Sequence, residues 1–152
     1  MKDIDKILNN LRRQCSRREY CTSDVQKKAE KALDGDKEKA AEVVNILVAE
    51  KYVDDQRYCE AYAREKSSIS GWGEVKIRYM LSAKGISKDV ISQALTQIDP
   101  QRAELRLEKL LENKYRTLKE DPQWKLKLIR FALGRGYSYD DVNDCIQKMK
   151  DR

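Results

Sequence analysis

The sequence predicts an all-α fold: an elongated tandem array of three-helix modules, with about nine helices, a shortened last module and no significant sheet. Three observations predict it. Glycine and proline are scarce, at 6 and 2 of 152 residues, while the helix-favouring residues Lys, Glu, Leu and Ala are abundant. Apolar stripes with helical spacing recur along the chain, and turn and cap residues stand at matching places around them.

The apolar stripes recur at a constant offset of fifty-one residues. In each stripe the apolar residues occupy positions i, i+3, i+4 and i+7, which lie on one face of a helix. A match over so many positions indicates an internal repeat. The three stripes are Ala40, Val43, Val44 and Leu47; Ile91, Ala94, Leu95 and Ile98; and Val142, Cys145, Ile146 and Met149.

Turn and cap residues place the helix bounds. A leading helix is expected over about 3–18, and before each stripe another helix ends at a glycine that can adopt a left-handed conformation. Each stripe helix then begins at a capping residue, and Ser138 with Asp141 approximates a capping box. The glycines are Gly35, Gly85 and Gly136, and the caps are Asp36, Ser87 and Ser138.

Further helices begin at acidic residues. Asp54 or Asp55 opens the helix after the first stripe, and Asp99-Pro100 opens the helix after the second, since proline fits a first helical turn. Asp121-Pro122 opens the third copy in the same way.

These bounds divide the chain into a leader helix over 1–20, three-helix modules over 21–69 and 70–118, and a shortened module over 119–152. Such small modules bury little apolar surface alone, so part of their stability should come from stacking on their neighbours. A stacked array should present a long concave face that suits an extended partner.

Charge is abundant and unevenly distributed. Charged residues make up 38% of the sequence, and the formal net charge is +6. The segment 32–69 is acidic while both ends are basic, which favours one face for a polyanion and another for a protein surface. The longest apolar runs fall far short of the ~20 residues that a membrane span needs, so we expect a cytoplasmic protein without a membrane partner.

Catalytic chemistry is not expected. The sequence has no histidine, and phosphate-binding, dinucleotide-binding and hydrolase motifs are missing from it. The acidic pairs at 54–55 and 140–141 fall where helices begin, so helix capping is favoured over the alternative of metal binding or catalysis. We assign no catalytic residue, metal, cofactor or small-molecule substrate. The four cysteines lack metal-binding spacing and are expected to be reduced and mostly buried: Cys15, Cys21, Cys59 and Cys145.

Basic residues on equivalent helices are the strongest functional signal. An ordinary solvated face explains any one of them, but repetition on the same element favours a continuous stripe that contacts phosphates. The candidate contacts to DNA or a filament are Lys27, Lys28, Lys76, Arg78, Lys84, Lys125, Lys127, Arg130 and Arg135.

Trp72 allows two interpretations. Between two glycines at the start of a helix, it could stack on a nucleic-acid base. It could also pack onto the first helical turn, and the similar position of Trp124 in the third copy favours packing.

Three stretches resemble the RecX family. LVAEKYVDDQRYCEA at 47–61 is similar to one family signature, GWGEVKIRYMLSAKGIS at 71–87 to a second, and CSRREYCTSDVQKKA at 15–29 to the opening segment. The departures are Lys51 for the usual glycine, Cys59 for alanine and Tyr58 for the commoner phenylalanine. The family-signature residues are Asp54, Asp55, Arg57, Tyr58, Gly71, Trp72, Gly73, Leu81, Lys84, Gly85 and Ile86.

The resemblance implies a non-enzymatic protein that binds the RecA recombinase and its filament on single-stranded DNA, and that limits filament growth, strand exchange and coprotease activity in DNA repair, recombination and the SOS response. Single-stranded or double-stranded DNA is then an expected partner. Two alternatives remain open: a stand-alone nucleic-acid-binding repeat protein, and a protein scaffold for which DNA is irrelevant.

Overall fold

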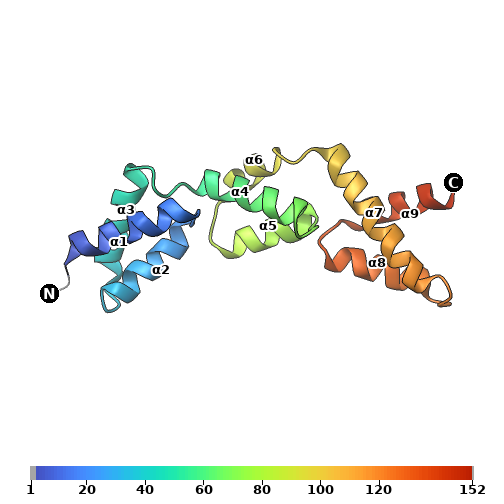
Figure 1. The fold of residues 1–152 in the computed structure, drawn as a ribbon, viewed down its shortest axis with the longest axis horizontal. Helices are drawn as coiled ribbons and strands as arrows, with labels where there is room; N and C mark the ends of the chain where they lie inside the picture. Colours follow the sequence, from blue (N-terminus) through green and yellow to red (C-terminus); the bar gives the residue numbers. More distant parts are fainter. Residues whose placement is uncertain (1–2, 152) are drawn as a thin grey trace. The chain divides into compact units, whose positions relative to one another are not determined.

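The computed structural model describes residues 3–151, and within this range the chain forms nine α-helices and no strand (Figure 1). The predicted all-helical class is therefore confirmed. The predicted leader helix over 1–20 begins at a residue outside the described range. The predicted module over 119–152 ends at one. The helices are α1 (Ile4–Arg17), α2 (Thr22–Ala32), α3 (Lys37–Ala49), α4 (Asp55–Ser68), α5 (Glu74–Ala83), α6 (Lys88–Leu95), α7 (Pro100–Leu118), α8 (Trp124–Gly134) and α9 (Tyr139–Lys150).

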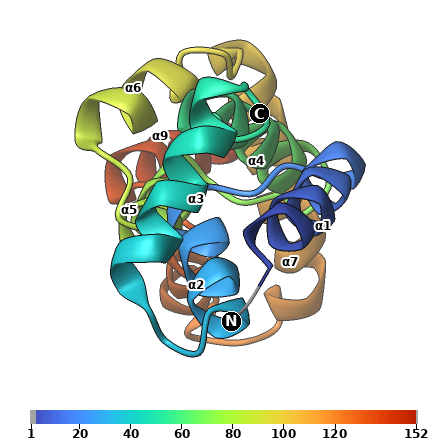
Figure 2. The ribbon, with the colours of Figure 1, turned by 90° about the vertical axis from the view of Figure 1, so that its left-hand side faces the viewer.

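The chain forms two compact units: residues 1–61 with 82–94, and residues 62–81 with 95–152. In the first unit α1, α2 and α3 lie side by side (Figures 1 and 2) and share one apolar core. The predicted stripe on α3 is buried there, from Ala40 to Leu47. Arg12 of α1 holds both carboxylate oxygens of Glu50 just after α3, at 2.9 and 2.6 Å.

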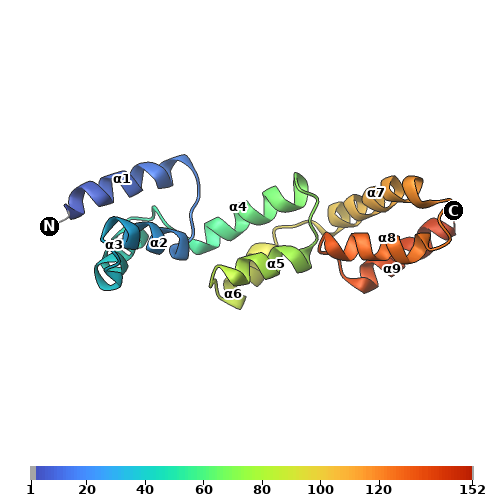
Figure 3. The same cartoon turned by 90° about the horizontal axis from the view of Figure 1, so that it is seen from below.

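In the second unit α7 packs along α8 and α9 (Figure 3), again around one core. The third predicted stripe contributes Val142, Cys145 and Ile146 as buried residues, with Met149 partly buried against them. Shared cores thus group α1 with α2 and α3, and α7 with α8 and α9. The predicted modules 21–69 and 119–152 instead begin with α2 and α8, one helix after the start of each group. These module boundaries stay a prediction.

The second stripe is buried at Ile91, Ala94 and Leu95 on α6. Its last member, Ile98, lies beyond the end of α6 and is only half-buried. All four cysteines are buried and free, and burial raises the pKa of Cys59 to about 12, so its thiol is neutral.

Most predicted caps are observed. The side chains of Asp36, Ser87, Asp99 and Ser138 accept backbone hydrogen bonds at the starts of α3, α6, α7 and α9. The three predicted glycines all have positive φ, between 77 and 97°.

One predicted helix start is wrong. Asp121 and Pro122 lie in a turn, and α8 begins only at Trp124. Asp121 accepts a hydrogen bond from the backbone N–H of Gln123 at 2.8 Å. The side chain therefore closes a turn around Pro122 before the helix starts.

Candidate nucleic-acid interface

The acidic residues of the first signature cap two different helices. Oδ1 of Asp54 accepts from the backbone N–H of Arg57 at 3.1 Å and so caps α4. Oδ1 of Asp55 instead accepts from the N–H of Thr22, the first residue of α2, at 2.8 Å. Both carboxylates satisfy helix N–H groups that have no partner within the helix, as the capping interpretation predicted.

Arg57 fastens the turn between α3 and α4. Its Nε is 3.0 Å from Oε1 of Glu19, and its Nη2 donates to the backbone carbonyls of Lys51 and Tyr52, at 3.2 Å each. Lys51 itself has φ of 66°, a left-handed conformation that favours glycine. The arginine therefore positions a strained turn.

The second signature forms a close contact between α5 and the turn before α9. A Cβ on Gly73 would lie 2.5 Å from the carbonyl oxygen of Gly136, and one on Gly136 would lie 2.3 Å from Cβ of Lys76. The hydroxyl of Tyr137 donates to the carbonyl of Gly71 at 3.0 Å. Gly73 and Gly136 are needed because the chain segments approach closely here, whereas Gly71 has open space around it and a φ of 71°.

Four further signature residues serve the core or a turn. Tyr58, Leu81 and Ile86 are buried, and Gly85 has φ of 77°. Trp72 and Lys84 differ from them, because both side chains are only half-buried.

In the first unit the structure brings together Lys27, Lys28 and Lys84. Nζ of Lys84, just after α5, donates to Oδ1 of Asp24 on α2 at 2.7 Å, one helical turn before Lys27 and Lys28. Burial by itself raises the pKa of Asp24, but hydrogen bonds from Lys84 and Cys21 lower the pKa below its usual value.

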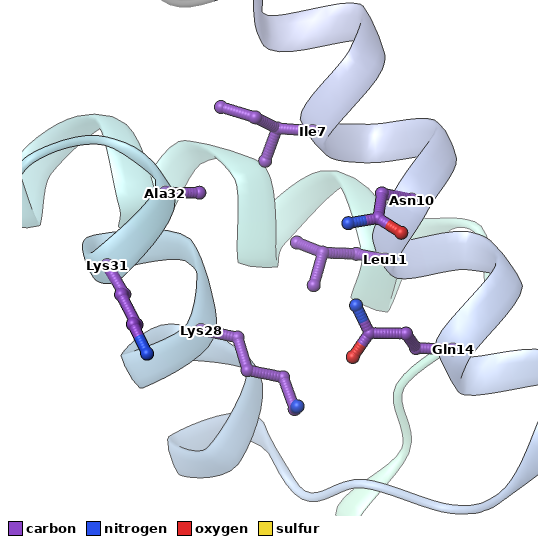
Figure 4. A pocket seen from close by; sticks show the side chains of 7 residues that line it. All are labelled: Ile7, Asn10, Leu11, Gln14, Lys28, Lys31 and Ala32. Carbon is purple, nitrogen blue, oxygen red and sulfur yellow. The ribbon is translucent and has the colours of Figure 1, made fainter.

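A pocket opens beside Lys28, between α1 and α2 (Figure 4). Its volume is 310 Å³. Apolar side chains of Ile7 and Leu11 line it together with the amides of Asn10 and Gln14, and two ammonium groups lie on its α2 side. The ammonium groups belong to Lys28 and Lys31.

The second unit holds the other six candidates. Arg78 pairs with Glu74 at 2.8 Å, and Lys127 pairs with Asp121. Lys125 and Arg130 on α8 are exposed. The remaining two lie over aromatic rings: Lys76 over Trp72 and Arg135 over Phe131.

The prediction missed a recurring arrangement in which one aromatic ring carries two cations. The guanidinium of Arg18 and the ammonium of Lys28 lie 4.9 and 4.8 Å from the ring centroid of Tyr20. The ammonium groups of Lys66 and Lys76 lie 4.9 and 4.2 Å from that of Trp72. Phe131 carries Lys114 and Arg135 at 4.8 and 5.0 Å.

Sequence spacing could not pair these groups, because Lys66 of α4 and Lys114 of α7 come from the helix before the turn that leads to the ring. For Tyr20 and Trp72 the available signal was an aromatic residue just before a helix, with basic residues on both sides of it, whereas Phe131 lies within α8. Such a cluster offers an aromatic surface with positive charge beside it, the combination that single-stranded nucleic acid binds.

Two family descriptions match the chain. "RecX, second three-helix domain" matches residues 54–95, which contain α4, α5 and α6. "RecX, third three-helix domain" matches residues 105–146, which contain α8 and most of α7 and α9.

Whole proteins are similar as well. The Regulatory protein RecX of Clostridium perfringens (strain SM101 / Type A) is 34% identical over 127 residues, 81% of this chain and 58% of that protein. Its namesake in Clostridium tetani (strain Massachusetts / E88) is 32% identical over 111 residues, 70% of this chain and 50% of that protein. The chain thus spans little more than half the length of these relatives.

The crystal structure of RecX from Lactobacillus salivarius has the same fold, with a TM-score of 0.86 at 24% identity, and the match covers 98% of this chain and 97% of that one. The matched three-helix domains and the curated relatives agree with the signatures at 47–61 and 71–87: the chain belongs to the RecX family.

Proposed function

We propose that this protein is a non-catalytic regulator that binds RecA and its filament on single-stranded DNA and limits filament growth, strand exchange and coprotease activity. Membership of a family whose relatives are named regulatory proteins supports this proposal. The observation that carries it is the placement of basic side chains on the second helices of both matched domains, α5 and α8.

The ion pairs of these cations can be exchanged for phosphate. Arg78 and Lys127 pair with Glu74 and Asp121 at the surface, where the four side chains are 28 to 62% exposed. Such pairs contribute about 0–1 kcal/mol each, whereas each phosphate contact releases condensed counterions from DNA. A filament's phosphates can therefore displace the carboxylates at little cost.

Regulation then follows from differential affinity. A protein that binds one filament geometry or filament ends more tightly shifts polymerisation towards that state without consuming any substrate. We assign the basic residues to DNA or to the groove of the filament, and the acidic segment 32–65 to basic protein surface. The site of action is proposed to be the cytoplasm. No helix between residues 3 and 151 has the length and apolar character of a membrane span.

The test is a triple charge reversal, Lys76→Glu with Arg78→Glu and Lys127→Glu. It should weaken suppression of RecA's DNA-dependent ATP hydrolysis, while circular dichroism shows an unchanged helix content. The matched control reverses three exposed lysines outside the candidate set, Lys39, Lys109 and Lys119, and should leave suppression intact. Full suppression by a folded triple variant would remove these residues from the site.

A stand-alone nucleic-acid-binding protein is the second candidate function, and the ring-and-cation clusters favour it. It predicts salt-sensitive DNA affinity with no contact to RecA. A pure scaffold predicts that neither DNA nor salt matters. Salt titration of DNA binding, together with a RecA pull-down, separates the three.

A further inference from the structure

Trp72 lies between two ammonium groups from different helices. Lys66 stands near the end of α4 and Lys76 near the start of α5, and the Tyr62 ring meets the same indole edge to face, with centroids 6.4 Å apart. We propose that these four residues, the Trp72 clamp, hold one base of single-stranded DNA on the indole and its flanking phosphates on the two lysines. This rests on the proposed function only in taking single-stranded DNA as the ligand.

The backbone on both sides of the indole is fixed. The N–H of Trp72 donates to the carbonyl of Lys66 at 2.8 Å, and the N–H of Gly73 donates to that of Arg135 at 2.8 Å. The carbonyl of Gly71 accepts from the Tyr137 hydroxyl. The backbone that carries the ring is therefore already ordered, so stacking of a base on the ring adds little cost of ordering the backbone.

A base that stacks on the indole can displace the two lysines, because stacking contributes more affinity than the cation–ring contacts that are lost. Each ammonium group over the aromatic ring is held by about a two- to fivefold equilibrium preference, so the two together are held by about four- to 25-fold. A stacked base contributes about five- to 150-fold in affinity. When the base stacks on the ring, the ammonium groups move to the neighbouring phosphates and pair with their negative charge.

A second ring supports the assignment. Tyr20 stands two residues before α2, as Trp72 stands two residues before α5, and it also carries two cations. Trp124 differs, because its half-buried indole packs against the core of α7, α8 and α9, meets Tyr115 edge to face at 5.2 Å and has one cation over it, Lys150 at 5.9 Å, where Trp72 has two. Trp124 is therefore an internal control for the role of Trp72.

Tryptophan fluorescence tests the clamp directly. In a Trp124→Phe variant Trp72 is the only tryptophan, and a short oligothymidylate should quench its emission. In a Trp72→Phe variant, which retains Trp124, the same oligonucleotide should leave the emission nearly unchanged. An abasic oligonucleotide of equal length, which offers phosphates without bases, should leave the emission of Trp72 unquenched.

Affinity gives a second readout. Trp72→Ala should bind oligothymidylate about five- to 150-fold more weakly. Lys66→Gln with Lys76→Gln should lower the slope of log affinity against log salt by about 1.4, since each phosphate contact on a single strand contributes about 0.7. The paired control, Lys109→Gln with Lys119→Gln, should keep the slope.

The clamp is overturned if oligothymidylate does not bind, binds without quenching Trp72, or quenches it no more than the abasic strand. RecA regulation is measured separately, with RecA filaments. Quenching without any RecA contact would remove the proposed function and leave the clamp. RecA regulation without quenching would remove the clamp and leave the proposed function.

Discussion

Asp55 of α4 accepts a hydrogen bond from the first backbone N–H of α2, at Thr22, over 2.8 Å. The carboxylate therefore joins two helices that are more than thirty residues apart in the sequence. It does so half-buried, next to Asp54, which caps its own helix.

The first prediction concerns this cap. Asp55→Ala should lower the free energy of unfolding by about 1 kcal/mol, because a helix N–H loses its partner, and Asp55→Asn should restore part of it. Asp140→Ala, an exposed first-turn acid of α9, should cost only about 0.3 kcal/mol. Urea denaturation measures both, and equal losses for the two alanines would contradict the assignment.

Lys51 gives the second prediction. Its φ of 66° is unfavourable for a residue with a side chain, so Lys51→Gly should raise the free energy of unfolding by about 1 kcal/mol. Lys51→Ala keeps the same unfavourable backbone and should give no such gain. A glycine variant no more stable than the alanine variant in urea would refute the account of this turn.

Three glycines allow a graded third prediction. Gly136→Ala should be strongly destabilising, by several kcal/mol, because φ is +97° and the new Cβ would lie 2.3 Å from that of Lys76. Gly35→Ala meets open space at φ of +89° and should cost about 1 kcal/mol.

Gly134 is the control for this series. It is the last residue of α8 and has open space around it, so Gly134→Ala should stabilise by up to about 1 kcal/mol. Thermal melting ranks the three variants. A Gly136→Ala protein that melts with the wild type would show that the α5 contact is absent.

The fourth prediction is pH-dependent. The pKa of Asp24 is lowered in the folded state, so its contribution is present above the ordinary Asp pKa of about 3.9 and is lost as pH falls through the lowered value. Lys84→Gln removes the positive charge beside the carboxylate and should raise the pKa of Asp24.

The stability difference between wild type and Lys84→Gln should therefore shrink as the pH falls below about 4. It should stay under about 1 kcal/mol even at neutral pH, because the Lys84 and Asp24 side chains are 40 and 20% exposed. Denaturation across this pH range measures it. A difference that grows on acidification would contradict the pairing.

Much of the fold could be predicted because it rests on local patterns. The stripe from Ala40 to Leu47, the cap at Ser138 and the turn at Gly136 each depend on residues close in sequence. The start of α8 could not be predicted from Asp121-Pro122 alone, since the same pair also closes a turn.

Less of the candidate site could be predicted, because the residues that contact one another there come from separate parts of the sequence. Repetition of basic residues identified Lys76 and Arg135, but nothing local places Lys66 beside Trp72 or Lys84 beside Asp24. The family signatures could be identified from the sequence, but their roles could not. Arg57 and Gly73 match a family pattern, yet their contacts show that they build turns and helix contacts.

The most direct measurement of the central claim is co-sedimentation of this protein with filaments of its cognate RecA, with and without single-stranded DNA. We expect the protein to sediment with the filament on DNA, and the charge reversal of Lys76, Arg78 and Lys127 to reduce the bound fraction. A protein that stays in the supernatant with filaments present, while binding DNA alone, would contradict that claim.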